Sequence, residues 1–398
     1  MSSRTPFPVP PQVDRLQRTA LIVGLAGTLL TVLGLLFNRD QFLRSWLFAH
    51  LFWTGAAVGC LSLLLINHLT GGVWGIVIRR LLEAGGRTAP LLALLFVPVA
   101  LGLPRIYEWA RPEIVAADPI LLMKRPYLNV PFFLGRAAFF FAAWWLLAHV
   151  LSRWSDELDR TGSLRAARRL RGAAGGGLLV LGFTITFSAV DWGMSLDPHW
   201  YSTIYGILFM VGQVLTAMAL MIVLLVWFRE EAPFAQVLRP QVFHDLGKLL
   251  FAFVMLWGYV NFSQFLIIWS GNLPEEIPWY IQRAHGGWQI LLLLVLVFHF
   301  VLPFLLLLSR DLKRSAPTLA RVAGVLFVMR TVDLFWLVAP DLHHGHGLSL
   351  SWMDVTAPVG IGGLWLWWFA RELKARPLMP QHEPDLEEFL AQPAEGHA

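Results

Sequence analysis

Long apolar stretches alternate with short polar segments along nearly the whole chain. A helix needs about 20 mainly apolar residues to cross the hydrocarbon layer of a bilayer. The pattern therefore predicts an all-α membrane protein with about ten transmembrane helices. We expect them near residues 19–37, 43–66, 89–104, 131–151, 173–190, 202–227, 249–270, 287–308, 320–338 and 353–370.

The predicted membrane domain covers residues 19–372. It lies between an N-terminal tail, residues 1–18, and a polar, acidic C-terminal tail, residues 373–398. The third span is the weakest, because it is short and contains Pro90 and Pro98. Before it, residues 73–82 are expected to form an interfacial helix.

The basic residues follow this alternation. With the N-terminus inside, the inner segments contain 22 Lys and Arg residues and the outer loops contain 7; Arg136 and Arg330 lie within spans. Cytoplasmic loops carry the excess of Lys and Arg, so we expect both termini in the cytoplasm. Because the positive charge recurs between spans and is not gathered on one face, the net charge of +5 does not indicate nucleic-acid binding.

The number of cysteines excludes several kinds of covalent and metal site. Of 398 residues, 57% are hydrophobic and 14% are charged, and there is a single cysteine, Cys60. One thiol excludes an intrachain disulfide, an iron–sulfur cluster held by this chain's own thiolates, and covalently attached haem. Any metal centres used in redox chemistry would therefore belong to partner subunits, and we assign no metal ligand and no catalytic residue.

Ionisable residues inside spans are costly and usually face a bundle interior or a wet cavity. Arg330 and Asp333 are three residues apart on one helix face. They are either a self-neutralising pair or part of a proton path in which Arg330 tunes Asp333. His299, at the middle of its span, is either a packing residue or a proton relay; haem ligation would require a second histidine at matching depth.

Polar groups also gather near the two ends of the spans. His244, Asp245 and Lys248 form either a solvated helix start or the entrance to a proton half-channel on the inner side. On the outer side, the segment 191–206 contains Asp191, whose position after an apolar run is not explained by helix capping alone. A pocket or partner-contact surface is predicted from Asp197, His199, Trp200, Tyr201, Glu275 and Glu276.

A cluster of His343, His344 and His346 in an outer loop is either a surface metal site or a set of solvated loop residues. Asp197 before Pro198 fits the start of a helix.

Two segments carry a resemblance to a known family. D-W-G-M-S-L-D-P-H-W-Y-S-T-I-Y-G at 191–206 and F-S-Q-F-L-I-I-W-S-G-N-L-P-E-E at 262–276 resemble segments of the NrfD-like membrane subunits of alternative complex III. The ten-span plan and the chain length also match, and the chain looks like the smaller of the two such subunits, the ActF type.

The resemblance implies two four-helix bundles flanked by two further helices. It also implies a role in (mena)quinol oxidation, with electrons passed to a cytochrome c or a blue-copper protein, in the bacterial inner membrane. Partner subunits, including a sister NrfD-like subunit, an iron–sulfur subunit and c-type cytochromes, would carry the clusters and haems. Menaquinone would bind at or near this chain, lipids would surround it, and proton half-channels would run through it.

On this basis the proton path would comprise Asp191, His244, Asp245, Lys248, His299, Arg330 and Asp333. Two alternatives remain: a structural scaffold subunit without transport, and a secondary transporter. A secondary transporter would show broken helices and a binding site related by internal repeats. No close internal repeat is evident in the sequence.

Overall fold

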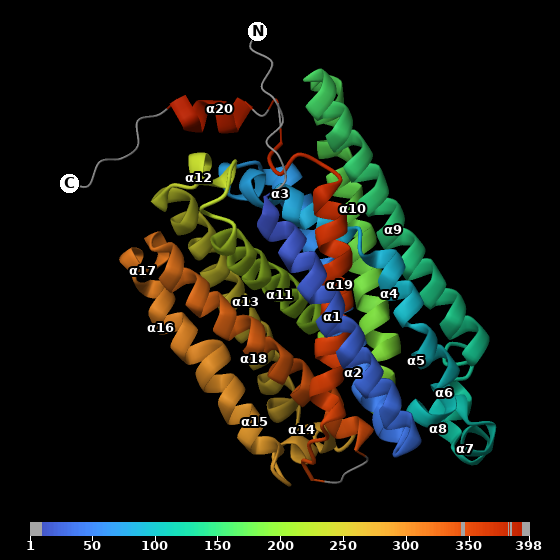
Figure 1. Cartoon of the computed structure of the whole chain (residues 1–398). Coiled ribbons are helices and arrows are strands. Elements are labelled where there is room, and N and C mark those ends of the chain that lie inside the picture. The colour runs from blue at the N-terminus through green and yellow to red at the C-terminus, as the bar shows by residue number, and fades with distance from the viewer. Residues whose placement is uncertain (1–9, 344–346, 381, 383, 392–398) are drawn as a thin grey trace.

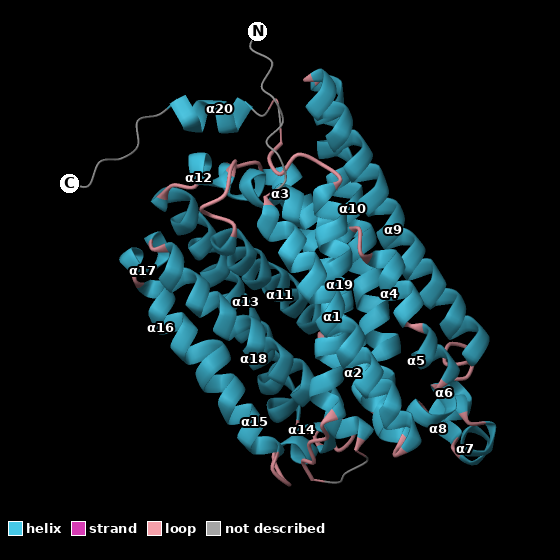
Figure 2. Cartoon of the chain, viewed as in Figure 1, coloured by secondary structure: helices cyan, strands magenta, loops and turns pink. Residues whose placement is uncertain are grey.

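A computed structural model describes residues 10–343, 347–380, 382 and 384–391. In this described part the chain is helical and contains no strand (Figure 2). Nine helices or helix runs of the described part are long and apolar enough to cross a membrane. Large apolar side chains such as Leu25, Phe183 and Leu293 are exposed on them, as expected for lipid-facing surfaces. The prediction of an all-α, multi-pass membrane protein is confirmed.

The long helices form two groups of four, with two helices beside them (Figure 1). The first bundle contains α2 (Arg39–Thr70), a broken run of α3 (Val73–Gly86), α4 (Ala89–Leu95), α5 (Val97–Leu101) and α6 (Leu103–Ile106), then α9 (Val130–Thr161) and α10 (Leu164–Trp192). The second contains α11 (Tyr205–Trp227), α13 (Pro240–Gly271), the run α15 (Trp288–Leu294), η4 (Val295–Val301) and α16 (Leu302–Leu308), and α18 (Ala316–Leu342). The flanking helices are α1 (Pro11–Leu33) and α19 (Met353–Lys374).

Short helices connect these elements: η1 (Gly34–Leu36), η2 (Glu108–Ala110), α7 (Pro112–Ala117), α8 (Pro119–Lys124), η3 (Met194–Leu196), α12 (Phe234–Val237), α14 (Pro278–Arg283), α17 (Arg310–Arg314) and α20 (Pro384–Ala391). In Figure 1, α3, α12, α17 and α20 lie at the end of the molecule where α1 begins and α19 ends; we call it the tail end. The opposite, loop end carries α7, α8 and α14. The segments expected to share a side of the membrane therefore do lie at the same end.

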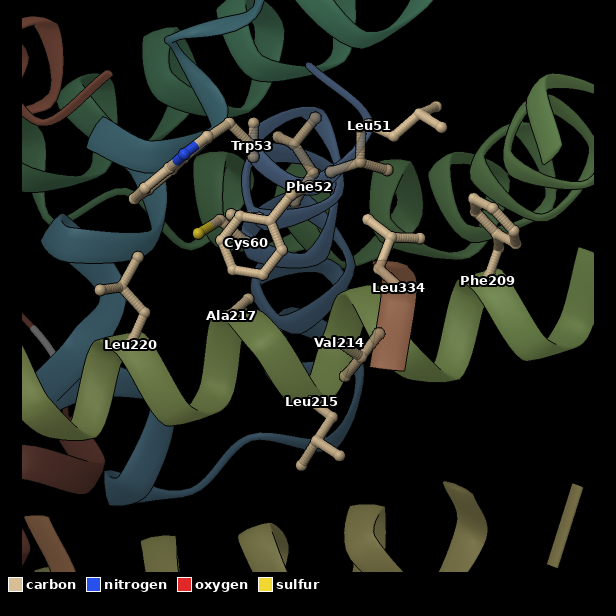
Figure 3. Close-up of a cluster of buried hydrophobic side chains, with 14 of the residues drawn as sticks. Leu51, Phe52, Trp53, Cys60, Phe209, Val214, Leu215, Ala217, Leu220 and Leu334 are labelled. Atoms are coloured by element: carbon tan, nitrogen blue, oxygen red, sulfur yellow. The ribbon is translucent and has the colours of Figure 1, made fainter. Parts of the chain in front are cut away.

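The core joins the bundles through α2 and α11. Figure 3 shows Phe52 and Cys60 of α2 beside Ala217 of α11, with Leu334 of α18 nearby. Gly59 makes this approach close: a Cβ there would lie 2.1 Å from the carbonyl oxygen of Gln213. Only a residue without a side chain fits at that contact.

Glycines also join the two flanking helices. A Cβ on Gly363 would lie 2.4 Å from the Cα of Gly24, and one on Gly27 would lie 2.8 Å from the Cα of Gly360. Small residues allow membrane helices to pack by van der Waals contact where no hydrophobic driving force exists between them. The tenth expected span, 353–370, corresponds to α19, which is not among the nine.

The structure corrects the third span. The segment expected to be an interfacial helix, 73–82, is the beginning of α3, whose residues from Gly75 to Gly86 are buried, and α3 to α5 form one spanning run, 73–101. The sequence pattern missed this because Arg79, Arg80 and Glu83 look like interfacial residues, whereas the fold surrounds them with protein. Several other helices extend beyond their apolar runs; α9, for example, continues to Thr161, ten residues past the predicted end at 151.

Candidate functional site

An acid–arginine pair lies in the first bundle near its loop end. Asp191, in the last turn of α10, is fully buried. Its two carboxylate oxygens accept hydrogen bonds from Arg136 of α9, Oδ2 from Nε at 2.7 Å and Oδ1 from Nη2 at 2.9 Å. The guanidinium also lies over the rings of Tyr127 and Phe132, 3.8 and 4.3 Å from their centroids. Asp191 is thus a neutralised partner in a bidentate pair, which is a strong geometry for such ions.

The second bundle contains a corresponding pair. Arg283, at the end of α14, donates from Nη2 to Asp341 Oδ2 at 2.7 Å and to the Leu337 carbonyl at 2.8 Å. Its guanidinium stacks over Trp279, 3.5 Å from the ring centroid. In both bundles the acid is in the last turn of the fourth element and the arginine stacks on aromatic rings.

A third ionisable group lies midway along the helices of the second bundle. Arg330 and Asp333 of α18 form an ion pair, and Trp257 Nε1 of α13 donates to Asp333 Oδ2 at 3.0 Å. His299 packs edge-on against Trp257, with the two ring centroids 4.6 Å apart. Both nitrogens of His299 are buried without a hydrogen-bond partner in the described part of the chain.

The backbone around His299 is unusual. The segment Val295–Val301 is a π-helix inside an otherwise α-helical span. Such segments occur frequently at functional sites. On the opposite side, Gly212 of α11 leaves room for Arg330, since a Cβ there would lie 2.3 Å from its Nη2. Neither the π-helix nor the role of Gly212 was recognised from the sequence.

A small cavity adjoins Arg330. Its volume is about 10 Å³, close to the space one water needs. Polar groups in its wall include Gln213, Thr216 and Arg330, and the buried Gln213 Oε1 has no hydrogen-bond partner among the described residues. One water in this cavity could satisfy that oxygen.

The predicted tail-end cluster lies at the start of α13. Lys248 Nζ and Asp245 Oδ1 are 2.6 Å apart in a largely exposed ion pair, and His244 is half-buried. Trp257 is nine residues further along, or about 14 Å at the rise of an α-helix. Hydrogen bonds and ion pairs of the described part join residues within each of the three groups, at 191, 330 and 244, but do not join one group to the next.

The predicted outer surface divides into a buried and an exposed part. Trp200 is buried and stacks on Trp279 with ring centroids 4.8 Å apart, so it is a core residue of the loop end. His199 is exposed, and its Nε2 lies 2.6 Å from Asp118 Oδ2. A hydrogen bond from His199 lowers the pKa of Asp118.

Asp197 does not begin a helix. Its Oδ1 accepts the backbone N–H of His199 at 3.2 Å, which closes a turn after η3. Beside it, Lys124 Nζ donates to the Pro198 carbonyl at 2.6 Å and lies 5.9 Å from the ring centroid of the exposed Tyr201. Burial lowers the pKa of Lys124, although the Asp197 carboxylate opposes the shift.

No hydrogen bond or ion pair of the described part joins the remaining predicted outer residues to Asp197, His199 or Tyr201. Glu275 is exposed and Glu276 half-buried, in the loop between α13 and α14. His343 is buried, with Nδ1 2.7 Å from the Ala339 carbonyl; His344 and His346 lie outside the described residues. The described residues include no group of three or more His, Cys, Asp or Glu side chains placed to hold a metal ion.

A buried network of ion pairs lies at the tail end, and the sequence did not predict it. Arg80 of α3 pairs with Glu83 and with Asp159 of α9, and Arg376 pairs with Glu83 at 3.3 Å and Asp156 at 2.6 Å. The sequence feature that could have indicated it is the group Arg79, Arg80 and Glu83 before the weakly apolar third span. A scan against models of protein families found no match, and neither did a search of curated proteins.

Proposed function

We propose that this chain is an integral subunit of alternative complex III in the bacterial inner membrane, with both termini in the cytoplasm. In this role it supports (mena)quinol oxidation and proton translocation and is not catalytic alone. A sister NrfD-like subunit, an iron–sulfur subunit and c-type cytochromes accompany it, and electrons leave to a cytochrome c or a blue-copper protein. The motifs at 191–206 and 262–276 support the assignment, as does the arrangement of two four-helix bundles with two flanking helices.

The observation that carries a proton-handling role is the mid-span group of His299, Trp257, Asp333 and Arg330. Ionisable side chains buried at this depth are expensive and mark ion or proton pathways in many membrane proteins. Asp333 can take up a proton and is paired with Arg330, and both nitrogens of His299 lack a hydrogen-bond partner among the described residues. Moving one charge across 100 mV requires about 2.3 kcal/mol, which quinol oxidation would supply in the complex.

The single cysteine supports the division of labour with partners. Cys60 of α2 is fully buried, with its sulfur against Gly85 of α3, and its thiol is the only one in the chain. Electron carriers bound through cysteine would therefore belong to other subunits, while menaquinone would bind at or near this one.

A structural scaffold without transport is the second candidate. It is favoured by the direct pairing of Asp191, Asp333 and Asp341 with arginines, and by a mid-span cavity with room for about one water. A continuous proton path would require the gaps between the three groups to fill with water or to close during turnover.

Two measurements separate these functions. Affinity purification of the tagged full chain from native membranes should bring haem- and cluster-bearing subunits with it; their absence would contradict both the complex and the scaffold and would favour a secondary transporter. In liposomes containing the purified complex, Asp333→Asn should lower the protons moved per electron while quinol oxidation continues.

Asp354→Asn is the matched control, because Asp354 is also buried but lies at the loop end, where it accepts from Ser45 Oγ at 2.6 Å. An unchanged proton-to-electron ratio in Asp333→Asn would favour the scaffold.

A further inference from the structure

A basic cavity lies at the tail end of the first bundle, between α2, α3, α9 and α10. Its volume is about 350 Å³. Asn67, His68 and Arg79 line it from α2 and α3, and Arg168 and Arg171 line it from α10. Apolar side chains complete the wall: Ile76, Leu158, Leu164, Ala167 and Leu170. The cavity is therefore cationic and apolar at once, at the level where the spans end.

Arg168 and Arg171 place positive charge on the α10 side of this cavity. Among the described lining residues there is no Asp or Glu. The carboxylates on the same helices pair with other arginines: Glu83 and Asp159 with Arg80, Asp156 with Arg376, and Glu157 with Arg169. An anion is thus the natural complement of Arg168 and Arg171.

Next to the cavity, toward the membrane centre, α10 carries glycines and so has a strip of surface without side chains. Gly172 and Gly175 follow Arg168 and Arg171 at spacings of three to four, which places them on the same helix face. A Cβ added at Gly172, Gly175 or Gly176 would meet no heavy atom within 4 Å. These glycines are not used for helix packing within this chain, and they leave a shallow lipid-facing strip directly beside the two arginines.

We propose that this cavity binds the phosphate of an anionic phospholipid, with an acyl chain lying along the glycine strip of α10. Arg168 and Arg171 neutralise the phosphate, and His68, whose Nε2 is buried without a partner in the described part, is an additional donor. Basic pockets between transmembrane helices are suited to such headgroups. The site is independent of the proposed role in electron transfer.

Native mass spectrometry of the purified full chain, with any subunits that accompany it, tests the proposal. The probes are phosphatidylglycerol and phosphatidylcholine with the same acyl chains. One surface arginine is worth about fivefold in affinity for anionic lipid, so Arg168→Gln/Arg171→Gln should weaken phosphatidylglycerol binding about 30-fold. Phosphatidylcholine binding should not change.

The matched control is Arg153→Gln/Arg165→Gln. These arginines are exposed on α9 and α10, two of the helices around the cavity, and do not line it. The control removes the same charge and should leave phosphatidylglycerol binding unchanged. Equal weakening in both variants would mean general surface attraction and would overturn the site.

Two further outcomes distinguish a lipid from a free anion. Gly175→Leu fills the strip without changing the charge, and it should weaken lipid binding while the fold is retained. Displacement of phosphatidylglycerol by millimolar inorganic phosphate, or a lipid affinity unaffected by Gly175→Leu, would show that the cavity binds a phosphate ion and would overturn the proposal.

Discussion

The ion pair between Arg136 and Asp191 provides a quantitative test of how this membrane domain holds its buried charge. In Arg136→Met the guanidinium is lost, while a side chain of similar length still packs against Tyr127 and Phe132. The Asp191 carboxylate then remains fully buried without its cation. Removing one partner of a buried pair typically costs about 3–5 kcal/mol, because an uncompensated charge stays in a medium of low dielectric constant.

The chain contains a matched exposed pair. Arg105 and Asp40 are 2.8 Å apart, similar to the 2.7 Å between Arg136 and Asp191, but their side chains are 53% and 52% exposed instead of 10% and 0%. Exposed pairs contribute about 0–1 kcal/mol, since water solvates either ion alone. Arg105→Met should therefore lower the free energy of unfolding by no more than about 1 kcal/mol, and Arg136→Met by about 3–5 kcal/mol.

Reversible unfolding in mixed detergent micelles, followed by tryptophan fluorescence and circular dichroism, measures both values. The double variant Arg136→Met/Asp191→Leu should recover most of the loss, because replacing both ions by apolar side chains is often neutral. If Arg136→Met costs no more than Arg105→Met, or if the double variant is as unstable as the single one, burial of Asp191 is not what makes Arg136 necessary.

Three other outcomes follow from the structure. Gly363→Ala places a Cβ against the backbone of Gly24 and should cost about 1–3 kcal/mol; Gly182→Ala, which meets open space, should not destabilise, and equal effects in thermal unfolding would contradict glycine-mediated packing of α1 and α19. Because the pKa of Asp118 is lowered on folding, its contribution is present above its ordinary value near 3.8 and is lost as pH falls through the folded value. Hydrogen exchange of residues 118–124 should therefore accelerate below about pH 4, and should lose this pH dependence in Asp118→Asn. Maleimide should label the fully buried Cys60 only after denaturation; rapid labelling of the native protein would show that the contact between α2 and α3 opens.

Much of the fold could be predicted from local properties of the chain. Apolar stretches of spanning length predict where helices cross the membrane, and the distribution of Lys and Arg predicts which segments share a side. Figure 1 shows those segments at common ends. The helix boundaries were less predictable, because a helix such as α9 continues into the polar region, where water satisfies its side chains.

The candidate residues could be located individually from the sequence, but their partners could not. Asp191 and Arg136 are 55 residues apart, and Arg283 and Asp341 are 58 apart. Only groups within one helix were evident, namely Arg330 with Asp333 and the cluster that contains Asp245 and Lys248, since their members lie within about one turn of each other. A buried charge is recognisable from its apolar neighbours in the sequence, whereas its neutralising partner depends on which helices meet.

The sequence by itself determined that the chain is helical and crosses the membrane many times. It also determined that Lys and Arg are concentrated in the segments on one side of the membrane. Both follow from the sequence because hydropathy and charge act segment by segment. Tertiary structure alone decided that α3 is buried, that glycines bring α1 against α19, and that His299 faces Trp257 beside Asp333. The physical reason is that burial, pairing and close packing are properties of contacts between segments distant in the chain. The same apolar helix can face lipid, protein or a buried ion depending on which neighbours it meets.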